Sequence, residues 1–489
     1  MTRTLAAVLA ALCLAGPATG DDPEPKVLII GIDGLRAPAF EAADTPNLDA
    51  LIADGCYTDQ AHTGVVTVSG PGWSSFLCGV WMDRHGVTDN TFKGARFEEY
   101  PHFFKRLREA RPGVFTAHIV DWLPIDEQIL GSNADSDFRF THDYSDNGDE
   151  RMVNAAVDAL TNYDPGVTFV YFADVDAAGH KNGFHRTAPG YLKAIHKVDA
   201  QVGRVLDAMR ARATYADEDW LVIVSTDHGG TIDGSHGRNE DNHRKIPLIV
   251  SGRAAHKGRL YTTANQVDIP AIAMAHLGIA VDPEWGLDGR VVGLASATEL
   301  GVNLIFNGDA EYGRGYSDTE GNAGVPGWTD TGPMTVLVYG GSEGLPARDA
   351  PGAQERGDNF FCGGKGKGSA NMQVIDIADA ADRIDRGVGY ELSGWFGGYA
   401  DQRDLAWLTV RFLGDNGGEL GRTMIGEVTV QERIARFGEE DPTGFLRRSA
   451  SGRVPPGTRR IEVTLTAETG SGMCDGYADN LALVLTPAR

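Results

Sequence analysis

Three aspartates and three histidines stand at or soon after apolar runs of this sequence, where their side chains could bind metal ions. They are Asp33, Asp176, His180, Asp227, His228 and His236. Carboxylate oxygen and imidazole nitrogen are ligands for zinc and similar divalent ions, and three of each suffice for two adjacent metals. A single aspartate after a strand more often caps a helix or closes a turn, so each residue alone is a weak signal. Their joint order along the chain predicts a site for two Zn²⁺ or similar divalent ions.

The candidate nucleophile is Ser69, which opens the segment SGPGWSSFLCG. A free serine hydroxyl is a poor nucleophile near neutral pH, whereas coordination to a divalent metal stabilises its alkoxide. Two metals about 4 Å apart could hold an attacking and a departing oxygen in line. We therefore expect Ser69 to be both a catalytic residue and a metal ligand. Trp73, in the same segment, could stack on an aromatic leaving group or pack in the core.

Apolar runs that are typical of buried strands precede these polar side chains. The runs are VLIIGI at 27–32, VTFVYF at 167–172 and LVIVS at 221–225. Helical patterns lie between them, and the clearest is the amphipathic stretch 191–210. Strands that alternate with helices predict an α/β fold with a mostly parallel sheet between helices. In such sheets ligand sites lie outside the carboxyl ends of the strands, so the polar side chains should meet at one edge.

The amino-acid composition changes past about residue 297, where glycine, aspartate and threonine become frequent. Short alternating runs such as IEVTLT at 461–466 replace the long apolar ones, as in strands with one wet face. This pattern predicts an all-β sandwich. We expect three segments: a signal peptide at 1–20, a catalytic domain at 26–297 and the β-sandwich at 298–489.

Composition and charge limit the partners that this chain could have. The N-terminal stretch combines Arg3, an apolar run and small residues, which is the layout of a cleaved secretory signal, so we expect a secreted or periplasmic protein. No later stretch is long and apolar enough to predict a membrane span. The formal charge of −24 argues against binding of a nucleic-acid backbone.

Four cysteines follow the signal segment, and an exported protein can form disulfides. Cys362 and Cys474 both lie in the last third of the chain and are the expected pair. Cys56 and Cys78 fit a second bridge or two buried thiols equally well.

The order of these motifs resembles the alkaline phosphatase superfamily, most closely its nucleotide pyrophosphatase/phosphodiesterase branch. The resemblance covers residues 27 to about 295 and lies in GIDG, SGPGWSSFLCG, HGVTDN, DAAGH, TDHGG and the His-Gly pair at 236. It implies an exported hydrolase of phosphate diesters or monoesters that works through a covalent phosphoserine. It also implies the division of the metal ligands: Asp33, Asp227 and His228 would hold one zinc beside Ser69, and Asp176, His180 and His236 the second.

Other residues near the motifs leave alternatives open. The resembling phosphodiesterases have an asparagine at the position of Asn90, where it donates to a phosphoryl oxygen, although TDNT could be a plain turn. They usually carry threonine in place of Ser69 and asparagine in place of Gly72, which leaves the substrate preference open. His243 is a rival to His236, which the His-Gly pair favours. The remaining nearby histidines are expected to be structural or rim residues: His62, His85 and His185.

Sulfatases form a second branch of the same superfamily and give the main alternative function. Their motif reads Cys or Ser, any residue, Pro, any residue, Arg, and its first residue is converted to formylglycine. Ser69 and Pro71 fit this motif, but Trp73 replaces the arginine. A sulfuric ester hydrolase is therefore the alternative enzyme.

The C-terminal part resembles the galactose-binding-like jelly rolls of carbohydrate-binding modules, through NLIFNGDAE at 303–311 and DGYADNLALVL at 475–485. That resemblance implies a structural Ca²⁺, with Glu311 and Asp479 as candidate ligands, and a glycan as a possible partner. An alternative of another class follows, a non-catalytic glycan-binding protein on an inert scaffold. The complete ligand set in the first half argues against it.

Overall fold

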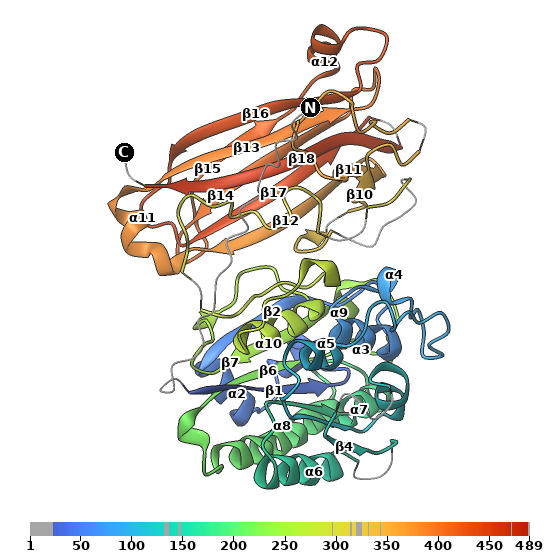
Figure 1. The fold of residues 1–489 in the computed structure, drawn as a ribbon, viewed down its shortest axis with the longest axis vertical. Helices are drawn as coiled ribbons and strands as arrows, with labels where there is room; N and C mark the ends of the chain where they lie inside the picture. Colours follow the sequence, from blue (N-terminus) through green and yellow to red (C-terminus); the bar gives the residue numbers. More distant parts are fainter. Residues whose placement is uncertain are drawn as a thin grey trace, which may run out of the picture.

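Two units follow one another along the chain, an α/β unit and an all-β unit (Figure 1). In this computed structural model the described residues are 23–487, except 132–135, 145–147, 296, 313–314, 319–324, 331, 343 and 471. The expected signal peptide at 1–20 lies outside the described residues. The predicted fold class is confirmed, while the domain limits at 26–297 and 298–489 stay a prediction.

The α/β unit is built on one eight-stranded sheet. In spatial order its strands are β4 (Phe138–Thr141), β3 (Thr116–Val120), β5 (Val167–Phe172), β1 (Glu24–Ile32), β6 (Glu218–Ser225), β7 (Lys245–Ser251), β2 (Gly55–His62) and β8 (Gly258–Arg259). Strand β1 lies between β5 and β6 and is parallel to both. Strand β7 is antiparallel to its neighbours β6 and β2. The sheet is therefore mostly parallel, as predicted.

Helices cover both faces of this sheet because successive side chains of β1 point to opposite sides. Val27 and Ile29 pack in a layer with residues of α3 (Ser69–Cys78), α5 (Phe103–Ala110) and α10 (Ile269–His276). Leu28 and Ile30 pack against α2 (Pro46–Ala53), α6 (Gly148–Asn162) and α8 (Pro189–Arg210). The other α-helices of this unit are α1 (Ala37–Phe40), α4 (Met82–His85), α7 (Asp174–Asn182) and α9 (Asp241–Arg244).

The all-β unit consists of two five-stranded sheets. One contains β10 (Thr335–Val338), β11 (Asn359–Lys365), β18 (Met473–Thr486), β13 (Gly389–Gly398) and β16 (Gly444–Arg453). The other contains β15 (Glu419–Gly426), β14 (Leu405–Leu413), β17 (Arg460–Glu468), β12 (Gly368–Asp376) and β9 (Thr329–Asp330). Phe396 of the first sheet and Val463 of the second belong to one buried cluster, so the sheets form the predicted sandwich. Two short helices, α11 (Ala381–Gly387) and α12 (Val430–Phe437), complete it.

The predicted disulfide between Cys362 and Cys474 is wrong. Both thiols are free and buried, as are those of Cys56 and Cys78. Cys362 packs with Phe360 and Tyr477 on one face of its sheet, whereas Cys474 belongs to the sandwich core on the other face. Across these strands Cys362 pairs with Tyr477, whereas Cys474 pairs with Gly364 beyond a shift of register. The Cys362 thiol donates to the main-chain oxygen of Cys474 at 3.4 Å.

Aromatic and arginine side chains join the two units. The Tyr312 hydroxyl of the C-terminal half donates to the carbonyl oxygen of Gly289 at 2.7 Å. The guanidinium of Arg460 on β17 lies 3.6 Å from the centre of the Tyr261 ring. As for membranes, none of the helices in the described part of the chain has the length and hydrophobicity needed to cross one.

Candidate active site

Three adjacent strands end at the same edge of the α/β sheet, and each is followed by chemically active side chains. Asp33 comes directly after β1, and Asp227 and His228 follow β6. Helix α7, which starts two residues after β5 ends, carries Asp176 and His180. Because β1 is paired along its length with β5 and β6, these strand ends lie side by side. His236 reaches the same edge from the loop after β6.

The first candidate metal group consists of Asp33, Asp227 and His228, whose ligand atoms all lie within 4.8 Å of one another. The Nε2 atom of His228 is 3.6 Å from Asp33 Oδ1 and 3.3 Å from Asp227 Oδ2. All three side chains are buried. This is the combination expected for the metal beside Ser69.

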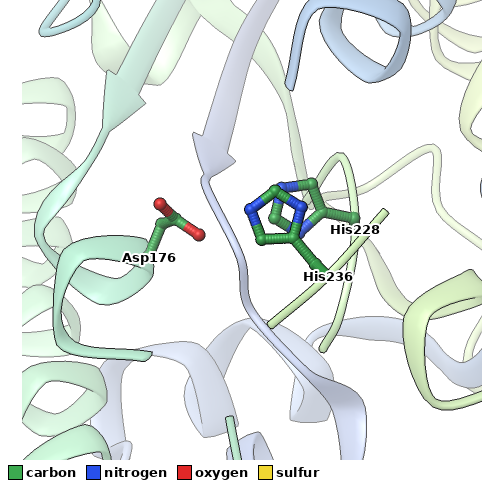
Figure 2. Close-up of side chains that lie close together, drawn as sticks. All are labelled: Asp176, His228 and His236. Atoms are coloured by element: carbon green, nitrogen blue, oxygen red, sulfur yellow. The ribbon is translucent and has the colours of Figure 1, made fainter. Parts of the chain in front are cut away.

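The second group combines Asp176 and His236 with His228, again within 4.8 Å. In Figure 2 the Asp176 carboxylate faces the two imidazole rings, which are stacked with their centres 3.9 Å apart. His180 completes the cluster, since its Nε2 lies 3.3 Å from Asp176 Oδ2 and 3.1 Å from His236 Nε2. All six predicted ligands therefore meet, but His228 belongs to both groups, so the division of the ligands between two metals stays a prediction.

Four of the ligand atoms are buried and have no hydrogen-bond partner in the part of the chain that the structure describes. They are Asp33 Oδ1, Asp176 Oδ1, Asp227 Oδ2 and His228 Nε2. Burial and the neighbouring carboxylates Asp33 and Asp176 raise the pKa of Asp227 well above its ordinary value. Buried polar atoms are normally paired, and buried carboxylates normally face a cation. A divalent cation at this position would satisfy the atoms that the protein leaves unpaired.

Each of the three clustered histidines is held in one tautomer by a main-chain carbonyl. The Nδ1–H groups of His180, His228 and His236 donate to the oxygens of Gly234, Gly229 and Thr67 at 2.9, 2.9 and 2.8 Å. Since a carbonyl only accepts, each ring turns its Nε2 towards the site, as metal-binding histidines do. His180 Nε2 and His236 Nε2 therefore need a proton or a cation between them. In the metal-free site the hydrogen bond to Asp176 raises the pKa of His180 to about 9, so His180 holds that proton.

Ser69 is the first residue of α3, after the extended Val68. The next main-chain group, Gly70 N–H, donates to Asn90 Oδ1 at 2.7 Å, so the Asn90 side chain lies beside the predicted nucleophile. Because the Asn90 Oδ1 atom accepts this hydrogen bond, the side-chain NH2 group of Asn90 can donate to another group. Position 72 has no room for a side chain, because a Cβ atom there would lie 2.8 Å from the Cβ of Asp227. The lack of a Cβ atom at Gly72 allows α3 to approach this candidate metal ligand.

Two aromatic side chains contact candidate metal ligands, and neither contact was predicted from the sequence. Trp73 is fully buried, and its Nε1–H donates to Asp33 Oδ2 at 3.0 Å, so it packs in the core instead of stacking on a leaving group. The Tyr144 hydroxyl donates to Asp176 Oδ2 at 3.3 Å, and its ring is 45% exposed. Tyr144 also has a φ of +33°, which is rare for a bulky residue. Only the folded structure brings their hydroxyl and N–H groups to the ligands.

The other histidines near the motifs lie outside both metal groups that the described residues form. His243 is fully buried, and neither ring nitrogen has a hydrogen-bond partner among them. His85 lies beneath α3, where its Nδ1 accepts from Val87 N–H and its Nε2 therefore donates to Ser75 Oγ at 2.9 Å. His185 Nδ1 lies 2.8 Å from Thr187 Oγ1. His62 is a residue of β2.

The two candidate calcium ligands of the sandwich are engaged by protein groups. Glu311 Oε1 accepts from Asn359 N–H, and Asp479 Oδ2 accepts from the Tyr339 hydroxyl, both at 2.7 Å. Burial raises the pKa of Asp479 to about 7, and the charge of Glu311 adds to this shift. Among the described residues they join no group of three candidate metal ligands. The calcium site stays a prediction.

Comparison with known proteins gives a match over the first half of the chain. Residues 27–235 match the family model described as type I phosphodiesterase / nucleotide pyrophosphatase. Human bis(5'-adenosyl)-triphosphatase ENPP4 is 24% identical over 223 residues, which cover 42% of this chain and 48% of that protein. Human ectonucleotide pyrophosphatase/phosphodiesterase family member 7 is 25% identical over 265 residues, covering 50% of this chain and 56% of that protein. The chain thus spans about half the length of the curated relatives it matches.

Solved structures of two kinds resemble about half of the chain. Murine ectonucleotide pyrophosphatase/phosphodiesterase 5 gives a TM-score of 0.43 at 16% identity, covering 53% of this chain and 96% of that one. A 2-O GAG sulfatase gives 0.45 at 16% identity, covering 54% and 72%.

Proposed function

We propose that this chain, whose residues 27–235 match the type I phosphodiesterase/nucleotide pyrophosphatase family, is an exported hydrolase of phosphoric esters with two divalent metal ions. One observation carries the proposal: four buried ligand atoms that have no hydrogen-bond partner among the described residues converge beside the helix that begins with Ser69, whose Gly72 and Trp73 contact Asp227 and Asp33. The family match supplies the substrate class, a phosphate ester. The mixture of carboxylate and imidazole ligands favours zinc.

The ligands would be divided as the motifs imply. Asp33, Asp227 and His228 would hold the metal beside Ser69, and Asp176, His180 and His236 would hold the other. When bound, the metals supply Lewis acidity and charge neutralisation. The protein supplies fixed positions, because carbonyl oxygens orient all three imidazoles.

The chemistry of the chain's own groups follows from this arrangement. Ser69 Oγ would attack phosphorus, forming a bond from serine to phosphorus while the bond to the departing alkoxide oxygen breaks on the opposite side. The Asn90 amide would donate to a phosphoryl oxygen. Water would then attack the phosphoserine, returning Ser69 and releasing phosphate or a phosphate monoester. Two in-line displacements give retention of configuration at phosphorus.

A sulfuric ester hydrolase is the second candidate, since Ser69 and Pro71 fit two positions of the sulfatase motif. Trp73 argues against this activity, because it occupies the position where the motif has arginine. Its side chain is buried, and its indole N–H donates to Asp33. We therefore assign Ser69 as an unmodified nucleophile.

The test is to compare nitrophenyl esters of three kinds on one preparation of the mature protein: phosphate monoester, phosphate diester and sulfate. We expect turnover of a phosphate ester that a chelator abolishes and zinc restores, with two metals per chain by elemental analysis. Activity on the sulfate ester alone would overturn the proposal. Active protein without two metals would overturn the six-ligand assignment.

Replacement of Ser69 by alanine should abolish turnover. The other ligands remain in this variant, so its zinc content should stay largely intact. Turnover near the wild-type rate would show that Ser69 is not the nucleophile. Mass spectrometry of the wild-type protein, quenched during turnover, should detect a phosphate on Ser69.

The sandwich would be an accessory unit, with a glycan as its proposed partner and calcium as a proposed structural ion. Trp395 lies on β13 and lines a depression with Arg436 and Asn480. Aromatic side chains that share one face could bind a sugar ring, but Trp407 lies on β14 of the other sheet and does not join Trp395 in this way. Binding of a glycan array to the wild-type protein, and its loss in Trp395→Ala, would test this role separately from hydrolysis.

A further inference from the structure

Two neutral donors converge on the same oxygen of Asp33. The Tyr171 hydroxyl donates to Asp33 Oδ2 at 2.6 Å, and Trp73 Nε1–H donates to it at 3.0 Å. The other oxygen, Oδ1, is buried and has no hydrogen-bond partner among the described residues. It is this second oxygen that lies 3.6 Å from His228 Nε2, in the first metal group. The carboxylate therefore has one oxygen held by the protein and one that points at the site.

Close packing prevents either donor from turning away. The rings of Trp73 and Tyr171 meet edge to face, with their centres 5.0 Å apart, and both are completely buried. Trp73 also lies against Gly31 of β1, where a Cβ atom would come within 2.6 Å of the indole ring. Fully enclosed aromatic rings cannot change rotamer without moving their neighbours. The two hydrogen bonds are thus fixed by the core.

The position of Trp73 in the chain links this support to the nucleophile. Trp73 and Ser69 lie on the same helix, four residues apart, which is about one turn. One rigid turn of α3 therefore fixes the position of Ser69 relative to Asp33, the candidate metal ligand that follows β1. Gly72, between them, lets this turn lie directly on Asp227.

From this geometry we propose that Trp73 and Tyr171 are positioning residues, which hold Asp33 as a one-oxygen metal ligand in register with Ser69. The inference rests on the proposed function, because it concerns the first of the two metals. By occupying Oδ2, the donors prevent the carboxylate from chelating the metal through both oxygens. Groups that orient metal ligands in this way typically change metal affinity by about 10- to 100-fold when they are removed.

The experiment measures metal binding directly and needs no substrate. Tyr171→Phe removes one hydroxyl and keeps the ring, and Trp73→Phe removes the indole N–H. The matched control is Tyr477→Phe, which deletes a buried hydroxyl beside an aspartate in the sandwich, 3.4 Å from Asp475 Oδ1. Metal-free proteins are titrated with Zn²⁺ against a chromophoric chelator, and with Co²⁺ while the visible spectrum is recorded.

We expect Tyr171→Phe to lower the affinity for one equivalent of zinc by about 10- to 100-fold and to leave the second equivalent unchanged. The Co²⁺ spectrum of that equivalent should change, because Asp33 can then bind through both oxygens. Trp73→Phe should act on the same equivalent, and Tyr477→Phe on neither. A general loss of stability would instead weaken both equivalents, and circular dichroism of the metal-free proteins checks the fold.

Wild-type affinity and an unchanged Co²⁺ spectrum in both Tyr171→Phe and Trp73→Phe would overturn the inference. If Tyr171→Phe does not fold, the result for Trp73→Phe decides. Failure of the proposed function looks different, since the wild-type protein would then bind two metals without hydrolysing any phosphate ester.

Discussion

At the scale of single residues, the active-site edge depends on small side chains as much as on the ligands. Gly70 N–H contacts the Asn90 side chain, and Gly72 lies against Asp227. Both glycines are in the first turn of α3, beside Ser69. The geometry of the proposed nucleophile therefore depends on two positions that have no side chain of their own.

Gly72→Ala should weaken metal binding and turnover together. The new methyl group would lie 2.8 Å from Asp227 Cβ, so either α3 or the ligand must move. A displacement of about 1 Å at a reacting group can lower the rate by about 100-fold. The control is Gly113→Ala, where an added Cβ meets nothing within 4 Å. Zinc titration and steady-state kinetics measure both effects, and unchanged values in Gly72→Ala would contradict the expectation.

Asn90 can be tested with two substitutions that separate its roles. Asn90→Asp keeps an oxygen that can accept from Gly70 N–H but has no N–H to donate, whereas Asn90→Ala loses both. Removal of one donor to a transition-state oxygen typically lowers kcat by about 100- to 1,000-fold. We expect both variants to lose kcat and to retain two zinc ions. Wild-type kcat in Asn90→Asp would show that Asn90 only positions the helix.

The types of the candidate ligand residues could be predicted from the sequence. The contacts that other side chains make with these ligands could not. Asp33 and Asp227 follow long apolar runs, which is a pattern that one sequence shows. Trp73 and Tyr144 reach Asp33 and Asp176 from distant parts of the chain, and no local pattern encodes such a contact. The predicted pairing of Cys362 with Cys474 failed for a related reason, since their shared place in the last third of the chain does not say which face of a sheet each thiol occupies.

At the scale of elements, a buried ion cluster joins the N-terminal ends of β1 and β6 to the end of α8. Glu218 opens β6, and its side chain is only 2% exposed. It accepts from the guanidinium of Arg212 at 2.8 Å and lies 3.8 Å from the buried ammonium of Lys26. This cluster lies at the end of the strands opposite to the metal ligands. It should affect stability without touching the chemistry.

Glu218→Gln should destabilise the protein by about 1.5–3 kcal/mol at pH 7, because it removes a buried, charged hydrogen-bond acceptor from Arg212. Arg212 and Lys26 each keep an ion pair with the exposed Asp164, which limits the loss. Burial alone would raise the pKa of Glu218, but the hydrogen bonds from Arg212, Thr214 and Trp220 outweigh it and lower that pKa to about 2. The folded pKa lies below the ordinary 4.5, so the stabilisation is present above about pH 4.5 and disappears towards pH 2.

Denaturant unfolding of the variant at pH 7 and pH 3 checks both the size and the sign of this effect. The difference from wild type should shrink at pH 3. Asp207→Asn is the control, because Asp207 is 80% exposed and its ion pair with Arg210 is on the surface. A difference that grows as the pH falls would contradict the assignment.

Strands with continuous apolar runs could be predicted, whereas β2 had no such pattern. The sequence of β2, GCYTDQAH, contains four polar residues and a glycine. Its strand conformation comes from pairing with β7 on one side and β8 on the other. A tertiary partner can override local propensity in this way, and one sequence alone does not show the partner.

At the scale of the whole molecule, the metal ligands draw together segments that are far apart in the chain. Asp33 follows β1, Asp176 lies in α7 and His236 lies in the loop after β6. All of them belong to the α/β unit, and the sandwich contributes no residue to either metal group among the residues described. Metal should therefore stabilise one unit and not the other.

Removal of zinc with a zinc-selective chelator should lower the unfolding temperature of the α/β unit. A ligand present at 100 times its dissociation constant stabilises the folded state by about 2.7 kcal/mol. Scanning calorimetry of the wild-type protein should show this shift, while the transition of the sandwich stays in place. Asp227→Asn should show little response to the chelator. A shift of both transitions would mean that the two units unfold together.

The candidate ligands are spread along the chain, so they are synthesised at different times. His236 is synthesised about 200 residues after Asp33, which takes on the order of 10–40 s at roughly 5–20 residues per second. During that interval Asp33 and Ser69 exist without the residues that complete their site. Binding of the proposed metals would therefore be a late event, and a polypeptide that crosses a membrane unfolded would take up its zinc from the compartment that it reaches. The metal content of the active protein would then report on its destination.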